Sequence, residues 1–216
     1  MLDLDLDLLA AETYSAVYSD VCDRLGLRHQ SMAPGIVPTN SKRVLVGWAR
    51  TARSAPVDGL PERPYAQEIE FVDSLRGGDV AVVATGDSNA ACWGELFSTA
   101  AIGRGARGVV TDGLVRDGAK LAHLDFPVHA QGSHPTDCLG RISIIETARP
   151  VEIGELTVSD GDLVVADVDG VVVVPRARAE EVAALALEKA RTENSARDLL
   201  LRGGYLRDVW AQYGVL

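Results

Sequence analysis

A fully apolar run at residues 80–84 is the clearest element in the pattern of hydrophobic and polar positions along the chain. Five consecutive apolar residues after a glycine-rich turn predict a strand buried on both faces, as in parallel sheets. A helix is predicted over residues 93–104, and another apolar strand over residues 108–111. Together they predict a β-α-β unit, a fold element whose ligand-binding loops lie at the carboxyl ends of the strands.

The hydrophobic and polar positions in the rest of the chain, together with this unit, predict an α/β fold. The opening Leu-Asp alternation is terminal and charged, so an irregular arm or an oligomer contact is predicted for about residues 1–8. Short strands bounded by glycine follow in the second half, where Asp160-Gly161-Asp162 and Asp169-Gly170 predict hairpin turns. Helices are predicted up to Leu25, over 65–75 and over about 176–198, and strands at 43–52, 126–130, 142–146, 151–153, 163–166 and 171–174.

Length and composition favour one globular domain spanning residues 1–216, with 47% hydrophobic and 24% charged residues. The formal net charge of -10, without a block of Lys or Arg, argues against nucleic-acid binding and fits small-molecule chemistry or an Arg-rich partner. Cys22, Cys92 and Cys138 are predicted to be reduced thiols. Because no apolar run is long enough to span a bilayer and no leader pattern is present, the protein is predicted to be cytoplasmic.

The start of the predicted helix at Trp93-Gly94-Glu95-Leu96-Phe97 is a candidate anion site. The first N–H groups of a helix lack partners within it, and the macrodipole makes that end positive. Gly94 lets a ligand approach the backbone, so the Glu95, Leu96 and Phe97 amides can hold a carboxylate. The alternative is an ordinary helix start with Glu95 favourably placed in its first turn.

Arg116-Asp117 follows Glu95 after twenty intervening residues. Arg116 offers a planar fork for a carboxylate or a keto oxygen, and Asp117 offers the hard oxygen ligand that Mg²⁺ or Mn²⁺ prefers. On local spacing alone, a surface Arg-Asp pair that caps the next helix explains these residues as well. The coincidence with the helix start and the glycine-rich strand ends favours a joint site for a divalent metal and a small anionic keto acid.

Other polar residues give weaker patterns. The spacing of His123, His129 and His134 matches no helical metal pair, so these side chains are predicted to be structural or exposed. Ser98 lacks the G-x-S-x-G context of a hydrolase, and no dinucleotide or P-loop motif occurs. Cys92 is predicted to be a buried thiol. Residues 167–170 could form a metal site, but a turn explains them adequately.

The chain resembles the RraA-like family, which includes 4-hydroxy-4-methyl-2-oxoglutarate aldolases of the class II pyruvate-aldolase type. The similarity runs from about Tyr14 to the last long helix. It implies a swivelling β/β/α domain assembled as a ring-shaped trimer or as a hexamer of two trimers. The matching pieces are Trp93-Gly94-Glu95-Leu96, Gly108-Val109-Val110-Thr111-Asp112-Gly113-Leu114-Val115-Arg116-Asp117, Phe126-Pro127-Val128, Gly161-Asp162-Leu163-Val164 and residues 167–175.

The resemblance also implies roles for individual residues. Asp117 would bind Mg²⁺ or Mn²⁺, Arg116 would contact the pyruvyl group, and the Leu96 and Phe97 amides would receive the substrate carboxylate. The aldolases carry Asp at the position of Glu95, which here could orient a water that moves the proton.

A glutamate from the C-terminal helix of a neighbouring subunit is expected near the site. Glu193 is the candidate, and Glu188 is the alternative.

The implied reaction is retro-aldol cleavage of a 4-hydroxy-2-oxo acid to pyruvate, with decarboxylation of oxaloacetate through the same enolate. The alternative is a non-catalytic regulator that binds an RNA-degrading endonuclease, as the family's namesake does. Retention of both Arg116 and Asp117 favours the enzyme, whereas the acidic charge suits either function.

Overall fold

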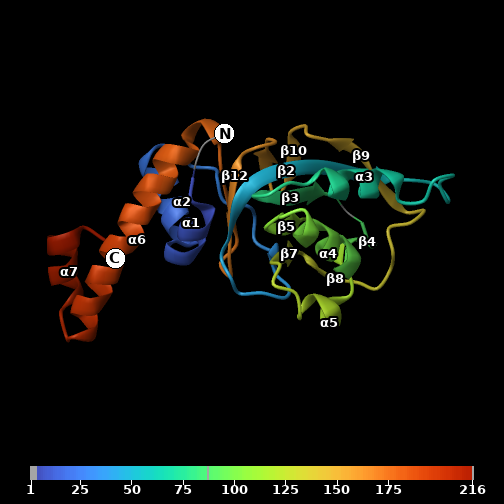
Figure 1. The fold of residues 1–216 in the computed structure, drawn as a ribbon. Helices are drawn as coiled ribbons and strands as arrows, with labels where there is room; N and C mark the ends of the chain where they lie inside the picture. The colour runs from blue at the N-terminus through green and yellow to red at the C-terminus, as the bar shows by residue number, and fades with distance from the viewer. Residues whose placement is uncertain (1–3, 87, 216) are drawn as a thin grey trace.

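The centre of the molecule is a mixed β-sheet flanked by helices (Figure 1). The computed structural model describes residues 4–86 and 88–215. Within these residues the sheet has eight strands in the order β1-β7-β5-β3-β2-β12-β13, with β9 also paired to β2. The strands are β1 (Val37–Pro38), β2 (Leu45–Pro56), β3 (Asp79–Ala84), β5 (Gly108–Thr111), β7 (Val128–Ala130), β9 (Ile142–Thr147), β12 (Leu163–Ala166) and β13 (Val171–Val174).

The predicted β-α-β unit is confirmed. Strands β3 and β5 are parallel neighbours, and helix α4 (Glu95–Gly103) lies between them in the sequence. Strand β2 pairs in parallel with β3, and β7 pairs in parallel with β5. The carboxyl ends of four parallel strands therefore lie along one edge of the sheet, where ligands bind in many α/β proteins.

A second, three-stranded sheet extends from this edge. It consists of β4 (Ala91–Trp93), β6 (Leu114–Val115) and β8 (Gly132–Ser133), which follow the carboxyl ends of β3, β5 and β7 in turn. The sequence pattern predicted none of these strands, and it wrongly placed Trp93 in the helix. The observed helix begins two residues later, at Glu95.

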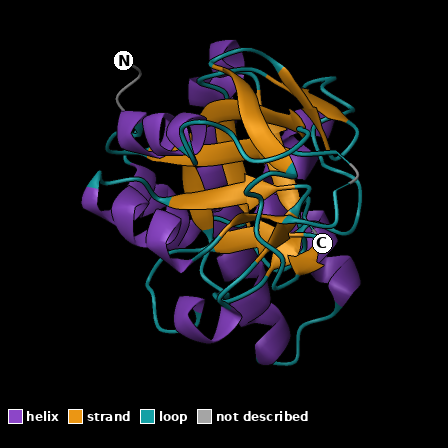
Figure 2. Cartoon of the chain, turned by 90° about the vertical axis from the view of Figure 1, so that its right-hand side faces the viewer, coloured by secondary structure: helices purple, strands orange, loops and turns teal. Residues whose placement is uncertain are grey.

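Alternate side chains of the main sheet enter two different cores, as the two-residue period of a strand requires. On one face Ala81 and Val83 pack under α3 (Ala66–Ser74) and α4. On the other face Val80 and Val82 pack under the hairpin of β10 (Val151–Ile153) and β11 (Leu156–Val158). A view at right angles shows the strands with helices around them (Figure 2). The layers are thus hairpin, sheet and helices, which confirms the predicted β/β/α arrangement.

Both ends of the described chain are more helical than predicted. Instead of an irregular arm, α1 (Leu6–Glu12) begins where Asp5 accepts a hydrogen bond from the Leu8 N–H at 2.9 Å and Leu9 is buried. Residues 1–3 of the predicted arm lie outside the described residues. After α2 (Ser15–Arg24), the helices α1 and α2 pack against α6 (Ala179–Leu201), which carries α7 (Leu206–Tyr213) beyond its end.

The remaining boundaries follow the predictions with small shifts. A short 3₁₀ turn, Arg176–Arg178, precedes α6, and a four-residue helix, α5 (Gly118–Leu121), follows β6. The Asp169-Gly170 hairpin is confirmed, because β12 and β13 pair around it. Asp160-Gly161-Asp162 does not close a hairpin: β11 pairs with β10, whereas β12 pairs with β2 and β13. None of the described helices is long and apolar enough to cross a membrane.

Candidate active site

The register of the small sheet brings the two predicted segments together. Strands β4 and β6 are parallel, with Trp93 opposite Val115, and the Arg116 N–H donates to the Trp93 carbonyl oxygen at 3.0 Å. Both strands end there, so Gly94 and Glu95 lie next to Arg116 and Asp117. Strand pairing thus accounts for the proximity that the sequence spacing indicated.

Gly94 lies so close to these side chains that a side chain of its own would displace them. A Cβ atom at this position would be 2.8 Å from Asp117 Oδ2 and 3.2 Å from Arg116 Cγ. The Glu95 N–H donates to Asp117 Oδ2 at 3.2 Å. The Asp117 carboxylate is therefore held against the beginning of α4, where the helix dipole stabilises negative charge.

The α4 amides remain available beyond Glu95. Within residues 4–86 and 88–215, the Leu96 and Phe97 N–H groups have no hydrogen-bond acceptor, whereas the Ser98 N–H closes the first turn onto Gly94 O at 3.1 Å. The Leu96 side chain is 75% exposed, and Phe97 packs edge-on against Trp93 with 5.6 Å between ring centroids. Two free amides at a helix start can bind an anion.

A cavity of about 250 Å³ opens beside these groups and is called the Arg116 cavity. The side chains of Arg116 and Asp117 are 37% and 40% exposed, so both can reach a ligand. Its lining comprises Tyr65, Ile69, Ala91, Cys92, Trp93, Gly94, Leu96, Phe97, Arg116, Asp117, Asp137 and Cys138. Arg116 is the one cation of this lining within the described chain.

Asp137 and Tyr65 are site residues that sequence reasoning missed. Asp137 Oδ2 lies 3.4 Å from Arg116 Nη1 and accepts a hydrogen bond from the Tyr65 hydroxyl. Burial alone would raise its pKa, but hydrogen bonds from Tyr65 and Cys138 and the charge of Arg116 hold the pKa of Asp137 below its ordinary value. The hydrogen bond to Asp137, together with burial, raises the pKa of Tyr65 to about 12.

Two residues of the site have an unusual backbone conformation. Tyr65 and Asp117 have φ angles of 58° and 63°, in the left-handed region that non-glycine residues rarely adopt, and Ala148 and Glu155, which do not line the cavity, share it. Such conformations cost about 1–3 kcal/mol each and are concentrated at functional sites. At Asp117 the strained backbone turns the chain from β6 into α5, which leaves the carboxylate beside Gly94.

The Glu95 side chain lies apart from the Asp117 carboxylate. Its Oε1 accepts a hydrogen bond from Thr99 Oγ1 at 3.0 Å, one turn along α4. Gly94, Leu96, Phe97, Arg116 and Asp117 therefore line one cavity, and Glu95 joins them through its backbone N–H while its carboxylate lies at the side.

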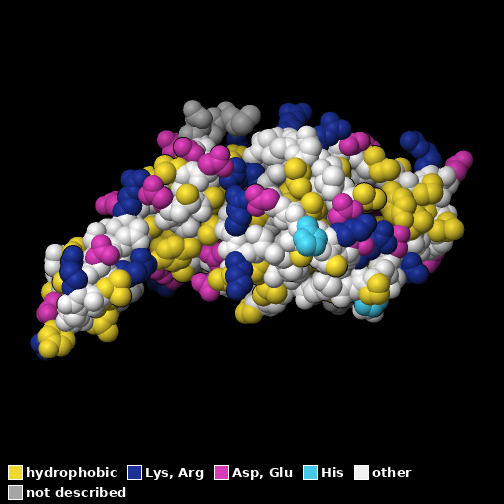
Figure 3. Space-filling model, turned by 60° about the horizontal axis from the view of Figure 1, so that its bottom comes forward, with side chains coloured by type: hydrophobic (Ala, Val, Ile, Leu, Met, Phe, Trp, Pro, Cys, Tyr) yellow, Lys and Arg dark blue, Asp and Glu magenta, His cyan; other side chains and the backbone are white. Residues whose placement is uncertain are grey.

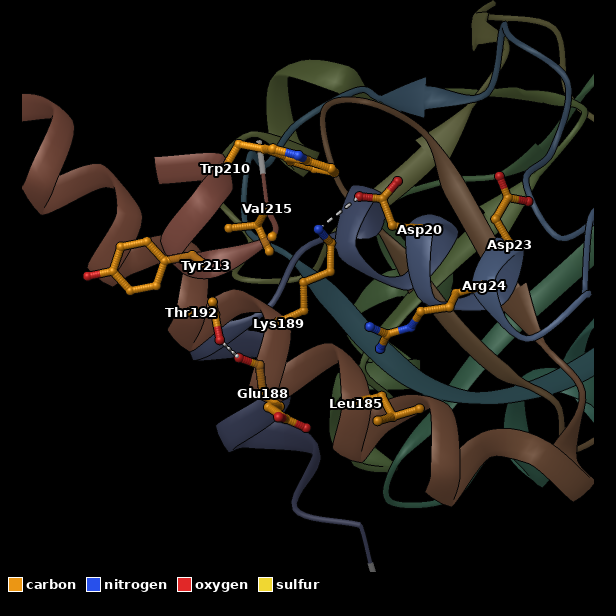
Figure 4. A pocket seen from close by; sticks show the side chains of 11 residues that line it. Asp20, Asp23, Arg24, Leu185, Glu188, Lys189, Thr192, Trp210, Tyr213 and Val215 are labelled. Carbon is orange, nitrogen blue, oxygen red and sulfur yellow. Dashed lines mark hydrogen bonds and ion pairs between the residues drawn. The ribbon is translucent and has the colours of Figure 1, made fainter. Parts of the chain in front are cut away.

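Glu193 and Glu188 are not part of this site within one chain. Both lie on α6, which projects from the opposite end of the molecule (Figure 1). Glu193 accepts a hydrogen bond from Tyr14 and is 2.7 Å from Lys189 Nζ. In the hollow between α2, α6 and α7, Lys189 also points toward Asp20, with 3.2 Å between Nζ and Oδ2 (Figure 4).

The donors around Asp117 are those that the hard cation predicted from the sequence would need. Within the described residues no three His, Cys, Asp or Glu side chains lie together as a metal cluster. Mg²⁺ is usually held by one or two carboxylates, with water and substrate completing its shell. Asp117 provides one such carboxylate beside an open cavity, and only its Oδ2 contacts Glu95 and Arg116. The residues present therefore fit Mg²⁺ or Mn²⁺ bound through Asp117.

The weaker candidates have structural explanations. His129 is buried and His123 and His134 are exposed, as predicted. Cys92 is buried, as predicted, and burial raises the pKa of its thiol to about 11. The Asp167 carboxylate accepts hydrogen bonds from the Ser15 N–H at 2.6 Å and the Ser15 hydroxyl at 2.7 Å, which ties a hairpin turn to the start of α2.

Comparisons with known proteins agree with this fold. A family model described as RraA-like, Aldolase/RraA, matches residues 18–173. A Halalkalibacterium halodurans protein named "Putative 4-hydroxy-4-methyl-2-oxoglutarate aldolase" is 31% identical over 185 residues, covering 83% of this chain and 80% of that one. The structure of Streptomyces coelicolor RraAS2, described as an unusual member of the RNase ES inhibitor RraA protein family, has a TM-score of 0.77 at 28% identity and covers 89% of this chain and 96% of that chain.

Other relatives match over a smaller part of their length. An uncharacterized protein of Methanocaldococcus jannaschii is 35% identical over 137 residues, covering 59% of this chain. The chain spans 61% of that protein and 32% of a Legionella pneumophila relative.

Proposed function

The chain belongs to the RraA-like family, and on this premise we propose that it is a divalent-metal-dependent lyase that cleaves 4-hydroxy-2-oxo acids to pyruvate. The observation that carries the proposal is the placement of Arg116 and Asp117 against Gly94 and the free amides of α4. One cation, one metal-binding carboxylate and two N–H donors around a cavity suit a small anionic keto acid. The names of aldolase relatives support the same reaction class.

Binding begins with the substrate carboxylate. The Leu96 and Phe97 amides receive it at the positive end of α4, and Arg116 contacts the 2-keto oxygen through its planar guanidinium. Asp117 would hold Mg²⁺ or Mn²⁺, which would supply Lewis acidity to the bound keto acid. The apolar walls formed by Trp93 and Phe97 exclude water and strengthen these electrostatic contacts.

Cleavage moves one electron pair and one proton. The 4-hydroxyl loses its proton, the C3–C4 bond breaks, C4 becomes a carbonyl carbon, and the electron pair forms the enolate of pyruvate. Arg116 stabilises the negative oxygen of that enolate, which then takes up a proton at C3. Loss of CO₂ from oxaloacetate leaves the same enolate, so oxaloacetate decarboxylation is proposed as a companion activity.

Proton transfer is proposed for Glu95 together with Glu193. Glu95 does not line the Arg116 cavity, so its side chain would have to turn away from Thr99 to act there. Because Glu193 lies on the far side of its own chain, it can contribute only to the site of a neighbouring copy. We therefore propose that the chain is a single domain that works as a trimer or a hexamer.

Metal-dependent release of pyruvate tests this function. Purified protein is incubated with 4-hydroxy-4-methyl-2-oxoglutarate or oxaloacetate, and pyruvate is followed with lactate dehydrogenase and NADH. Release is expected with Mg²⁺ or Mn²⁺, should stop with EDTA, and should return when the metal is added in excess. A rate that EDTA leaves unchanged would contradict the metal assignment.

A second candidate function is regulation of a ribonuclease. It is favoured by the similarity to Streptomyces RraAS2, a protein placed among RNase ES inhibitors, and it fits the net charge of -10, which suits an Arg-rich partner. On the face in Figure 3, Lys and Arg side chains are interspersed with Asp and Glu. Tight binding of an RNA-degrading endonuclease, with no turnover of any keto acid, would favour the regulator over the enzyme.

A further inference from the structure

Two free thiols form part of the wall of the Arg116 cavity. Cys92 lies in β4, and Cys138 lies in the segment between β8 and β9. Both side chains line the cavity, and both belong to the hydrophobic core on the α3 and α4 side of the sheet. They also line a small neighbouring space of about 10 Å³. Two thiols that are far apart in the sequence thus share the same surroundings.

Backbone pairing places these two cysteines side by side. Ala91 and Asp137 form an isolated parallel β-bridge, and the Ala91 N–H donates to the Thr136 carbonyl oxygen at 2.8 Å. Because the two segments run in the same direction, the residues that follow the bridge, Cys92 and Cys138, are neighbours across it. Strands paired in this way lie about 4.8 Å apart, within the Cα separation of about 4.4–6.8 Å that a disulfide spans.

The two side chains also face the same way. Successive side chains of an extended segment point to opposite sides, and the small space is lined by Cys92 and Cys138 but not by Ala91 or Asp137. Cys92 Sγ lies 3.3 Å from Thr111 Oγ1, and Cys138 Sγ lies 3.5 Å from Asp137 Oδ1. These contacts are weak, because a thiol is a poor donor and acceptor, so a rotation of either side chain can release them.

The Arg116 cavity gives a small oxidant access to the pair. Cys92 and Cys138 are only 7% and 5% exposed, and the cavity of about 250 Å³ reaches both. Hydrogen peroxide, which is little larger than water, can enter such a space. Burial raises the pKa of the Cys92 thiol to about 11 and that of the Cys138 thiol to about 12, so the reactive thiolate is scarce at neutral pH. Oxidation is therefore slow and requires an excess of peroxide.

A structural metal is a poorer explanation of the pair. Zn²⁺ in structural sites has four ligands, usually from Cys and His. Among the described residues, no group of three His, Cys, Asp or Glu side chains is placed to hold a metal ion. Two neighbouring thiols without further ligands are suited instead to pairing with each other.

A bond between the two sulfur atoms would act on the groups that orient Arg116. Cys138 directly follows Asp137, whose Oδ2 lies 3.4 Å from Arg116 Nη1. Oxidation removes the Cys138 S–H group, which now lies beside Asp137 Oδ1, and draws the segment that carries Asp137 toward β4. The position of the Arg116 guanidinium should change with it.

We propose that Cys92 and Cys138 are a redox-sensitive pair, which hydrogen peroxide joins as a disulfide and which in that form lowers the activity of the Arg116 site. The dithiol is the active state, and reduction of the disulfide restores it. The effect on activity rests on the proposed function, whereas formation of the disulfide does not depend on it.

The oxidation is balanced with one molecule of hydrogen peroxide. One cysteine attacks a peroxide oxygen as the thiolate, the O–O bond breaks, and a water molecule leaves a sulfenic acid behind. The second thiol attacks this sulfur, the S–O bond breaks, and a second water leaves as the S–S bond forms. Two thiols thereby lose two electrons and two protons, and the peroxide is reduced to two waters.

Peptide mapping tests for the disulfide itself. The reduced protein is treated with excess hydrogen peroxide, free thiols are blocked with iodoacetamide, and trypsin cleaves after Lys and Arg. Cys22, Cys92 and Cys138 then lie in separate peptides, residues 1–24, 77–104 and 121–141. Mass spectrometry should show peptide 77–104 joined to peptide 121–141, and dithiothreitol should separate them. Absence of the joined peptides, or a link through Cys22 instead, would overturn the proposal.

Pyruvate release measures the effect on the site. Peroxide is first removed with catalase, because it also reacts with 2-oxo acids. The kcat/KM of the oxidised protein should be at least about threefold below that of the reduced protein and should recover with dithiothreitol. Joined peptides with an unchanged kcat/KM would overturn the regulatory role. Joined peptides in a protein whose reduced form releases no pyruvate would reject the lyase and retain the disulfide.

Cysteine variants provide the matched controls. The double variant Cys92→Ala/Cys138→Ala lacks both thiols, so its kcat/KM should not change with peroxide. Cys22 is equally buried but belongs to another core and lines neither space, so Cys22→Ala should remain as sensitive as the wild type. Each variant is compared with its own untreated form, and melting temperatures check that it is folded. A double variant that loses activity as the wild type does would contradict the proposal, and the peptide map decides should this variant not fold.

Discussion

Arg116 Nη1 lies 3.4 Å from Asp137 Oδ2, the same oxygen that accepts the Tyr65 hydrogen bond. The three residues come from the end of β6, from the segment after β8 and from the residue before α3. Because the Asp137 pKa is held below its ordinary value, the carboxylate remains negatively charged at neutral pH and attracts the positive guanidinium of Arg116. Asp137 is therefore suited to fix the direction of the guanidinium.

Replacing Asp137 with Asn should reduce kcat/KM for pyruvate release by about tenfold, since a partly exposed charged contact is lost. Tyr65→Phe, which keeps the ring, should give a smaller loss of about threefold. The kcat and KM values of both variants, with melting temperatures, provide the measurement. Wild-type kcat/KM in Asp137→Asn would show that Arg116 does not depend on this contact.

Gly94→Ala should damage the site more than the fold. The new Cβ would be 2.8 Å from Asp117 Oδ2, the mobile end of a side chain, which can move at little cost to stability. We expect kcat/KM to fall at least about tenfold, because the Asp117 carboxylate would be displaced from its position in the site. Gly103→Ala, at the end of α4 with no atom within 4 Å of its Cβ, is the control and should retain activity. A similar activity in both variants would argue against a role for the Gly94–Asp117 contact.

His129 should make stability depend on pH. It is fully buried in the sheet, its Nδ1 has no partner within the described residues, and burial lowers its pKa to about 4. The unfolded chain, with a pKa near 6.5, binds this proton first as the pH falls. The free energy of unfolding should therefore fall by up to about 3 kcal/mol between pH 6.5 and pH 4.

Urea unfolding at pH 7, 6, 5 and 4 measures this dependence. His129→Gln removes the titrating group and should flatten the wild-type curve over that range. An equal slope in the two proteins would assign the pH dependence to other residues.

The sequence predicted the elements whose signal is local. The apolar run at residues 80–84 predicted β3, and the glycine-bounded runs predicted β12 and β13 within a residue of their limits. Helix α1 was missed because its leucines alternate with aspartates, although Leu6, Leu9 and Ala10 also have helical spacing. Strands as short as β6 and β8 carry too few residues for a period to be visible.

The site also divides into parts with a local sequence signal and parts without one. A helix start beside Gly94, placed two residues too early, and the pair Arg116-Asp117 were predicted, because each carries its chemistry in consecutive residues. Asp137 and Tyr65 were not, since they are 72 residues apart and meet only through the tertiary structure. No pattern within residues 131–141 distinguishes Asp137 from an ordinary loop aspartate.

The most direct test of the central claim is kcat/KM for pyruvate release by the Asp117→Asn variant with saturating Mg²⁺. This substitution keeps the size of the side chain and removes the charge that would hold the cation. The proposal predicts a loss of about hundredfold or more, with the oligomeric state and melting temperature unchanged. A rate within about threefold of the wild-type value would contradict the assignment of the metal to Asp117, and with it the proposed mechanism.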